Sequence, residues 1–288
     1  MVEKKPNTYI STFNLVKKSV APLYDEQEAI AIAKRFLEET INISSYEIFL
    51  YPDHHIHEMV QAKIEAGIER LAKGEPLQYV VGRMEYIGMD FQVTPDVLIP
   101  RPETEELVWW IAADQQGKEI NILDIGTGSG CIAISLARML PKATVYATDI
   151  SEKALTLATL NAKHNNVKVH FIHNDILNDF TSLPSVRFDI IVSNPPYITE
   201  KEKILMHRNV LEHEPHLALF VSNENPLQFY KAIAQLAGIL NAPVTTYLEI
   251  NEAFGNETAE LFLSVGFETM IRKDINGKQR MIRATPKA

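Results

Sequence analysis

A glycine-rich turn and an aspartate farther along the chain form the first group of residues that could do chemistry. Residues 124–130 read Asp-Ile-Gly-Thr-Gly-Ser-Gly and lie between an apolar run and a helical pattern. Glycines in that setting let the backbone approach a ligand that a side chain would block. Asp149 ends the next apolar run, nineteen residues after Gly130, and its carboxylate could accept hydrogen bonds from both hydroxyls of a ribose. This spacing fits a dinucleotide site and an S-adenosylmethionine site. The turn residues that are candidates for cofactor binding are Gly126, Thr127, Gly128, Ser129 and Gly130.

Each part of this pattern also has a purely structural interpretation. A glycine-rich turn can be a tight connection, and Asp149 could cap a helix that begins near Ser151. The joint occurrence of strand, spaced glycines, helix, strand and terminal Asp nevertheless favours a cofactor site. Farther along, the Asp175 carboxylate could accept from an adenine amino group, with Ile176 against the ring. A plain turn role for Asp175 is equally open.

The tetrapeptide Asn194-Pro195-Pro196-Tyr197 follows the apolar run FDIIVS and is the second chemical motif. Prolines contribute carbonyl acceptors but no N–H, and the Asn194 side chain adds another acceptor oxygen. A substrate NH₂ group could donate one hydrogen to the Asn194 side chain and the other to the Pro195 carbonyl. Such acceptors stabilise the positive charge that grows on a nitrogen as it attacks a sulfonium methyl group. Tyr197 could stack on the flat substrate group.

A proline-rich loop between a strand and a helix is the structural alternative for this motif. Its position after a later strand of the chain that carries the glycine turn favours a functional role. A dehydrogenase has no use for a cluster of acceptors, so the pair of motifs predicts a methyl donor rather than a hydride cofactor.

The pattern of apolar and polar residues along the chain predicts the elements that must position these motifs. From residue 119 onward, short aliphatic runs alternate with helical patterns, which is typical of an α/β domain with a parallel sheet covered on both faces. The last two runs are joined by Asn276-Gly277 and should form a hairpin. Strands are expected at 120–126, 143–150, 167–175, 188–194, 244–250, 267–275 and 280–285, with helices at 131–140, 152–165, 225–240 and 256–266.

The first part of the chain has a different pattern. Apolar positions recur at helical spacing from about Tyr24 to Gly74, and short β-like runs follow at 84–99. We therefore predict a helical substrate-docking domain, a β-hairpin linker and a catalytic domain. Their expected bounds are 1–82, 83–100 and 101–288.

Composition narrows the classes of function. The chain has 288 residues, and 28 Lys and Arg against 37 Asp and Glu leave a net charge of −9, which disfavours a nucleic-acid partner. The single Cys131 forms neither an internal disulfide nor a cysteine-based zinc site.

The remaining candidate residues have plain interpretations. The histidines at 54, 55 and 57 are interpreted as loop residues, so no metal is expected, and Trp109 and Trp110 are interpreted as packing residues. No apolar run is long enough for a membrane span, and we expect a cytoplasmic monomer with no membrane partner.

Residues 124–130, Asp149 and 194–197 together look like the class I S-adenosylmethionine methyltransferases that act on exocyclic or amide nitrogens. More specifically, 75–79, 98–105 and 192–198 resemble the release-factor glutamine methyltransferases of the PrmC/HemK type. The resemblance implies a Rossmann-like sheet of seven strands, the last one antiparallel. It also implies transfer to the N5 amide of the glutamine in the Gly-Gly-Gln motif of class 1 peptide-chain release factors.

On this resemblance, Gly126 to Gly130 and Asp149 would hold the cofactor, and Asn194 and Pro195 would hold the substrate amide. A role for Arg101, Glu103 and Glu105 near the cofactor rests on the resemblance alone. The stretch Glu249-Ile250-Asn251 departs from the family, which often has a small residue after this strand; we expect no effect on cofactor binding.

Two alternatives have different consequences for the partner. A DNA adenine or rRNA guanine N-methyltransferase would use the same kind of turn, but it must extract a base and contact phosphates, for which a net charge of −9 is poorly suited. A catalytically silent scaffold with this fold would have no chemical need for Asn194 or Asp149.

Overall fold

The computed structural model describes residues 7–240 and 243–287, and the chain divides into two compact units. The first comprises Met1–Arg83 and His207–His213, and the second comprises Met84–Met206 and Glu214–Ala288. The division places one short segment, remote in sequence, with the N-terminal helices.

The first unit is helical. Its longer helices are amphipathic and bury an apolar face around a core that includes the side chains of Val16, Leu37, Ile48 and Ile64. The helices are α1 (Tyr9–Val20), α2 (Glu26–Ile41), α3 (Glu47–Leu50), α4 (Glu58–Ala72), α5 (Leu77–Val81) and α9 (Arg208–His213).

Local signals explain where these helices begin and end. The Asp25 carboxylate caps α2 by accepting from the Glu28 N–H at 2.9 Å, and Asn42, with φ 55°, ends the same helix. The His57 ring caps α4 by accepting from the Met59 N–H at 3.2 Å. The expected helical region is confirmed for α2 and α4, whereas α1 begins before the predicted start of this region.

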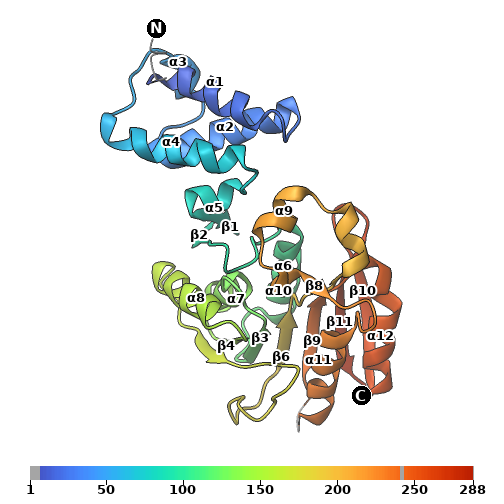
Figure 1. Ribbon diagram of the computed structural model, residues 1–288. Helices are drawn as coiled ribbons and strands as arrows, with labels where there is room; N and C mark the ends of the chain where they lie inside the picture. Colours follow the sequence, from blue (N-terminus) through green and yellow to red (C-terminus); the bar gives the residue numbers. More distant parts are fainter. Residues whose placement is uncertain (1–6, 241–242, 288) are drawn as a thin grey trace. The chain divides into compact units, whose positions relative to one another are not determined.

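The second unit is built on a seven-stranded sheet of order β10-β11-β9-β6-β3-β4-β5 (Figure 1). Strand β11 runs antiparallel to both neighbours and the other pairings are parallel, so the predicted Rossmann-like class and its antiparallel last strand are confirmed. The strands are β3 (Asn121–Ile125), β4 (Thr144–Asp149), β5 (His170–His173), β6 (Ile190–Ser193), β9 (Thr245–Glu249), β10 (Phe267–Lys273) and β11 (Gln279–Pro286).

Both faces of this sheet are covered, because successive side chains point to opposite sides. Ile122 of β3 belongs to an apolar cluster with residues of α6 (Pro102–Gln115), α7 (Cys131–Met139) and α8 (Glu152–His164). Its neighbour Leu123 belongs to a second cluster, on the other face, with residues of α11 (Gln228–Ile239) and α12 (Gly255–Ser264). Figure 1 shows helices on the two sides of the arrows.

Smaller elements complete the chain. A hairpin of β1 (Arg83–Tyr86) and β2 (Met89–Gln92) lies within the predicted linker, and β7 (Ile198–Thr199) pairs in parallel with β8 (Phe220–Val221). The remaining helix is α10 (His216–Leu219), and short 3₁₀ turns occur at η1 (Glu200–Leu205) and η2 (Glu252–Phe254). Within 7–240 and 243–287, no helix is both long and apolar enough to cross a membrane.

The parallel strands bring their carboxyl ends to one edge of the sheet. Strand β3 pairs with β4 on one side and with β6 on the other, so the order reverses at β3. Open α/β sheets bind ligands beside such a reversal, and both chemical motifs of the sequence lie there.

Candidate functional site

The glycine-rich turn connects β3 to α7 and exposes backbone to a pocket. Gly128 has φ +55°, in the left-handed region that favours glycine, and a Cβ added there would meet no other atom within 4 Å. Gly130 has φ +84°, but its added Cβ would lie 2.8 Å from Ile134 Cδ1 and 3.1 Å from Ala158 Cβ. Gly128 therefore leaves open space at the pocket, whereas Gly130 allows close packing beneath the turn.

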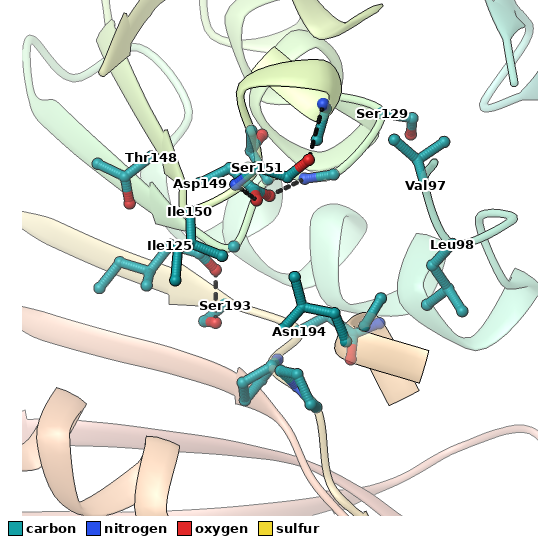
Figure 2. Close-up of a pocket in the computed structure, with 18 of the residues that line it drawn as sticks. Val97, Leu98, Ile125, Ser129, Thr148, Asp149, Ile150, Ser151, Ser193 and Asn194 are labelled. Carbon is teal, nitrogen blue, oxygen red and sulfur yellow. Dashed lines mark hydrogen bonds between the residues drawn. The ribbon is translucent and has the colours of Figure 1, made fainter. Parts of the chain in front are cut away.

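Asp149 ends β4 and fastens this turn. Its Oδ2 accepts from the Gly128 N–H at 2.8 Å, and its Oδ1 accepts from the Ser151 N–H at 2.9 Å. Burial raises the pKa of Asp149, and the two backbone donors oppose that rise. Each carboxylate oxygen has a second lone pair, so hydrogen bonds from a diol remain possible. Figure 2 shows Asp149 and Ser151 on one side of the pocket and Asn194 on the other.

The pocket brings most of the predicted site residues together. Asp175 and Ile176 line it after β5, although the Asp175 carboxylate also accepts from the Leu177 N–H at 3.0 Å and from Asn178 Nδ2 at 2.6 Å. Asp175 thus has the structural turn role as well as a place on the wall. The predicted residues on the wall are Gly126, Thr127, Gly128, Ser129, Asp149, Asp175, Ile176, Asn194, Pro195 and Pro196. Gly130 and Tyr197 are not part of it.

The Asn194 carboxamide follows β6 and is held from behind. Its Nδ2 donates to Thr104 Oγ1 at 3.1 Å, and the preceding Ser193 hydroxyl donates to the Ile125 carbonyl of β3 at 2.6 Å. The side-chain oxygen of Asn194 is the end of the carboxamide that remains as an acceptor for a ligand. The turn is therefore tied both to the sheet and to the start of α6.

Tyr197, the last residue of the tetrapeptide, contacts the sheet instead of the pocket. Its hydroxyl donates to Glu249 Oε1 at 2.9 Å, and its carbonyl accepts from Asn251 Nδ2 at 3.1 Å. These bonds hold the end of the tetrapeptide against the end of β9. The stacking role expected for Tyr197 receives no support from this placement.

Glu249 is a site residue that sequence reasoning missed. It is 1% exposed and accepts from the Thr104 hydroxyl at 2.6 Å as well as from Tyr197. Burial raises the pKa of Glu249, and the hydrogen bonds from the two hydroxyls oppose the rise. A carboxylate that ends an apolar strand run was a signal, since a buried charge needs dedicated partners. Thr104, 2% exposed, was not recognised either.

Asp124, the first residue of the glycine motif, is fully buried under the turn. Its Oδ2 accepts from the Thr127 hydroxyl at 2.6 Å. Burial raises the pKa of Asp124 to about 7, against the opposing effect of this hydrogen bond. Asp124 therefore stabilises the turn from below and does not line the pocket.

The linker motif reaches the pocket through Leu98, Pro100, Arg101 and Thr104. Arg101 lines the pocket, and its Nη2 lies 2.6 Å from Oε1 of the buried Glu214. Glu103 and Glu105 lie in the first turn of α6, where negative charge complements the helix dipole. Among residues 7–240 and 243–287, no cluster of three or more His, Cys, Asp or Glu side chains could hold a metal ion.

The site as a whole has two chemically different sides. Open glycine backbone and the Asp149 carboxylate can hold a polyhydroxylated cofactor, whereas Asn194 and Pro195 present acceptors suited to a planar NH₂ group.

Known protein families match residues of both units. Residues 104–219 match the methyltransferase small domain family, and residues 16–82 match the PrmC N-terminal domain. Release factor glutamine methyltransferase of Flavobacterium psychrophilum is 43% identical over 272 residues, 92% of this chain and 95% of that protein. The Bacteroides thetaiotaomicron protein of the same name is 41% identical over 93% of this chain and 97% of its own length. The crystal structure of a methyltransferase from Pyrococcus furiosus shares the fold at 20% identity, with TM-score 0.51, over 80% of this chain and 98% of that one.

Proposed function

The chain belongs to the release factor glutamine methyltransferase family, and we propose that it methylates the N5 amide of the Gly-Gly-Gln glutamine in class 1 release factors. The observation that carries the proposal is the orientation of the Asn194 side chain. Its Nδ2 donates a hydrogen bond to Thr104 Oγ1, which leaves the side-chain oxygen of Asn194 for a substrate amide. The family favours this substrate over the nucleic-acid alternative.

S-adenosylmethionine is the proposed cofactor, and it would supply a sulfonium methyl group as the electrophile. The chain's residues suit it, because the backbone at Gly126 and Gly128 is open: beyond the glycine and its two chain neighbours, no atom lies within 4 Å of a Cβ placed there. Asp149 would accept from the ribose hydroxyls with its remaining lone pairs. Asp175 and Ile176 would contact the adenine from the pocket wall.

Asn194 and Pro195 would hold the substrate nitrogen. A primary carboxamide nitrogen is a weak nucleophile, because its lone pair is delocalised into the carbonyl group. Acceptors at the Asn194 oxygen and the Pro195 carbonyl would bind its two hydrogens and stabilise the positive charge that develops as the N–C bond forms. The methyl group would leave the sulfonium sulfur, so that a C–S bond breaks as the N–C bond forms and a neutral thioether remains. The nitrogen would then lose one proton to solvent, which leaves a neutral secondary amide.

The N-terminal unit is proposed to dock the release factor, with residues 1–82 as the docking domain, 83–100 as the linker and 101–288 as the catalytic domain. Its match to the PrmC N-terminal domain supports this division of labour. Several large apolar side chains of the unit are exposed within one short segment, namely Tyr46, Phe49, Leu50 and Tyr51. We also propose that the protein is cytoplasmic and monomeric. Light scattering on the purified protein tests the monomeric state.

Labelled S-adenosylmethionine tests the proposed substrate. The full chain is incubated with a folded release factor, with its Gln→Ala variant at Gly-Gly-Gln, and with unmethylated DNA and ribosomal RNA at equal concentration. We expect label on the intact factor alone, and mass mapping should place it on the glutamine. Label that survives the Gln→Ala change, or that accumulates on nucleic acid, would overturn the proposal.

A further inference from the structure

We propose that Glu249 and Thr104 are positioning residues that fix which end of the Asn194 carboxamide faces the pocket. The inference rests on the proposed function of Asn194, and it assigns both residues a role that is exerted through Asn194. Thr104 lines the pocket, and Glu249 is not part of the lining. Its basis is a chain of hydrogen bonds that runs from β9, through the first turn of α6, to the tetrapeptide turn.

The direction of this chain follows from the donors and acceptors available. The Thr104 hydroxyl donates its single hydrogen to Glu249 Oε2 at 2.6 Å, the direction that an ionised carboxylate requires because it can only accept. The Thr104 oxygen can then only accept at the 3.1 Å contact with Asn194. The group of Asn194 at Thr104 is therefore NH₂, and the carbonyl end is directed elsewhere.

Burial limits the alternatives to these hydrogen bonds. Thr104 is 2% exposed and Glu249 is 1% exposed, so water does not readily replace either partner. The parallel register pairs Ser193 with Leu248, which places Asn194 and Glu249 one residue farther along adjacent strands. The second carboxylate oxygen is also engaged, because the Tyr197 hydroxyl donates to Oε1 at 2.9 Å.

The orientation of the carboxamide decides whether Asn194 can do its proposed work. With NH₂ at Thr104, the Asn194 oxygen is free to accept from a substrate NH₂ group. A carboxamide turned by 180° would present its own NH₂ to the substrate NH₂, a contact of donor with donor. Losing the restraint should therefore lower the rate of methyl transfer without weakening cofactor binding.

Substitutions at Thr104 separate orientation from packing. Thr104→Val keeps the shape but removes the hydroxyl, and Thr104→Ser keeps the hydroxyl but removes a methyl group. We expect Thr104→Val to lower kcat about 10-fold, the scale of one lost buried hydrogen bond, with unchanged cofactor affinity and unchanged KM for the release factor. Thr104→Ser should stay within about 3-fold of the wild type.

Thr246→Val is the matched control. Thr246 is a fully buried threonine of β9 whose hydroxyl has no hydrogen-bond partner among the described residues. The same substitution there should leave kcat unchanged. Glu249→Gln tests the same role independently. A glutamine side chain has one acceptor oxygen, whereas the hydroxyls of Thr104 and Tyr197 each need an acceptor. The substitution should lower kcat by about 10-fold or more.

A spectroscopic measurement on the cofactor-free protein makes the test independent of activity. The side-chain NH₂ of Asn194 is identified in ¹⁵N-labelled protein by its loss in Asn194→Ala. We expect its hydrogens to exchange with water at least about 5-fold faster in Thr104→Val than in the wild type, Thr104→Ser or Thr246→Val. If Thr104→Val does not fold, Thr104→Ala removes the same hydroxyl without adding bulk.

The outcomes distinguish this inference from the proposed function. If Asn194→Ala retains full methyl transfer, the proposed role of Asn194 is wrong. If Asn194→Ala is inactive while Thr104→Val keeps both wild-type kcat and slow amide exchange, the positioning role is wrong and the proposed function stands. Equal losses of kcat in Thr104→Val and Thr104→Ser would also overturn it, since they would indicate packing alone.

Discussion

Asp149 and Glu249 end strands β4 and β9 at the same edge of the sheet, yet their carboxylates are held by different kinds of donor. Asp149 accepts from two backbone N–H groups, those of Gly128 and Ser151. Glu249 accepts from two side-chain hydroxyls, those of Thr104 and Tyr197. Backbone donors are present whatever the side chains are, whereas hydroxyl donors are lost with a single substitution.

This difference assigns the two carboxylates different tasks. Asp149 belongs to the pocket wall and can reach a ligand directly. Glu249 lies behind the wall and acts on Asn194 through Thr104. One side of the site should therefore control cofactor affinity, and the other should control the rate of transfer.

The largest expected effect tests the transfer side. Asn194→Ala should lower methyl transfer by about 10²–10³, the usual cost of one preorganised polar partner, while cofactor affinity stays near normal. Single-turnover transfer to the release factor, together with calorimetry for the cofactor, measures both quantities. Retained turnover would mean that the tetrapeptide is only a structural turn.

Asp149→Ala tests the cofactor side. Loss of the charge-assisted hydrogen bonds to the ribose should weaken S-adenosylmethionine binding by roughly 1.5–3 kcal/mol in calorimetry. Asp189→Ala is a matched control, because Asp189 Oδ2 also accepts from a backbone N–H, that of Asn121 at 2.9 Å, and does not line the pocket. Equal losses in the two variants would contradict the ribose assignment.

A third prediction concerns the carboxylate that lies below the glycine turn. The pKa of Asp124 is raised by burial to about 7 from 3.8, so the folded state holds more protons than the unfolded state between these values. The stability contributed by this proton is complete below the unfolded pKa and is lost as pH rises through the folded one. The free energy of unfolding should therefore fall with rising pH in that window, by at most about 1.4 kcal/mol per pH unit.

Asp124→Asn should remove this part of the pH dependence. Urea unfolding at several pH values between these pKa values measures the slope in the wild type and in the variant. Asp149 and Glu249 also have raised pKa values and contribute to the slope in both proteins. The quantity that tests Asp124 is therefore the difference in slope between the wild type and the variant, measured in the same buffers. An unchanged slope in Asp124→Asn would show that Asp124 is not the group that titrates.

The smallest expected effect lies outside the pocket, on the N-terminal unit. Leu50 is 58% exposed and Tyr51 is 54% exposed, and burial of both by a release factor would contribute to docking. The double change Leu50→Ser and Tyr51→Ser should raise KM for the folded factor about 3- to 10-fold, with cofactor affinity unchanged. Leu263→Ser on α12, at a residue 45% exposed, is the control. An unchanged KM would place docking elsewhere.

The sequence by itself determined the α/β sheet and the local parts of the site. Alternating apolar runs and helical patterns identified the strands and helices, because their periodicity is local. The contacts of Asp149 are also short in sequence, since its partners Gly128 and Ser151 lie 21 and 2 residues away. Asp149 and the glycine turn could therefore be recognised as one group from their residue types and spacing alone.

Only the tertiary structure decided how the transfer side is assembled. Thr104 and Glu249 are 145 residues apart, and their bond requires the start of α6 to pack against the end of β9. The same packing places the Tyr197 hydroxyl at Glu249, 52 residues away, and not at the pocket wall. Residue types and spacing do not determine the direction of a side chain, because that direction depends on which distant donor or acceptor is buried beside it.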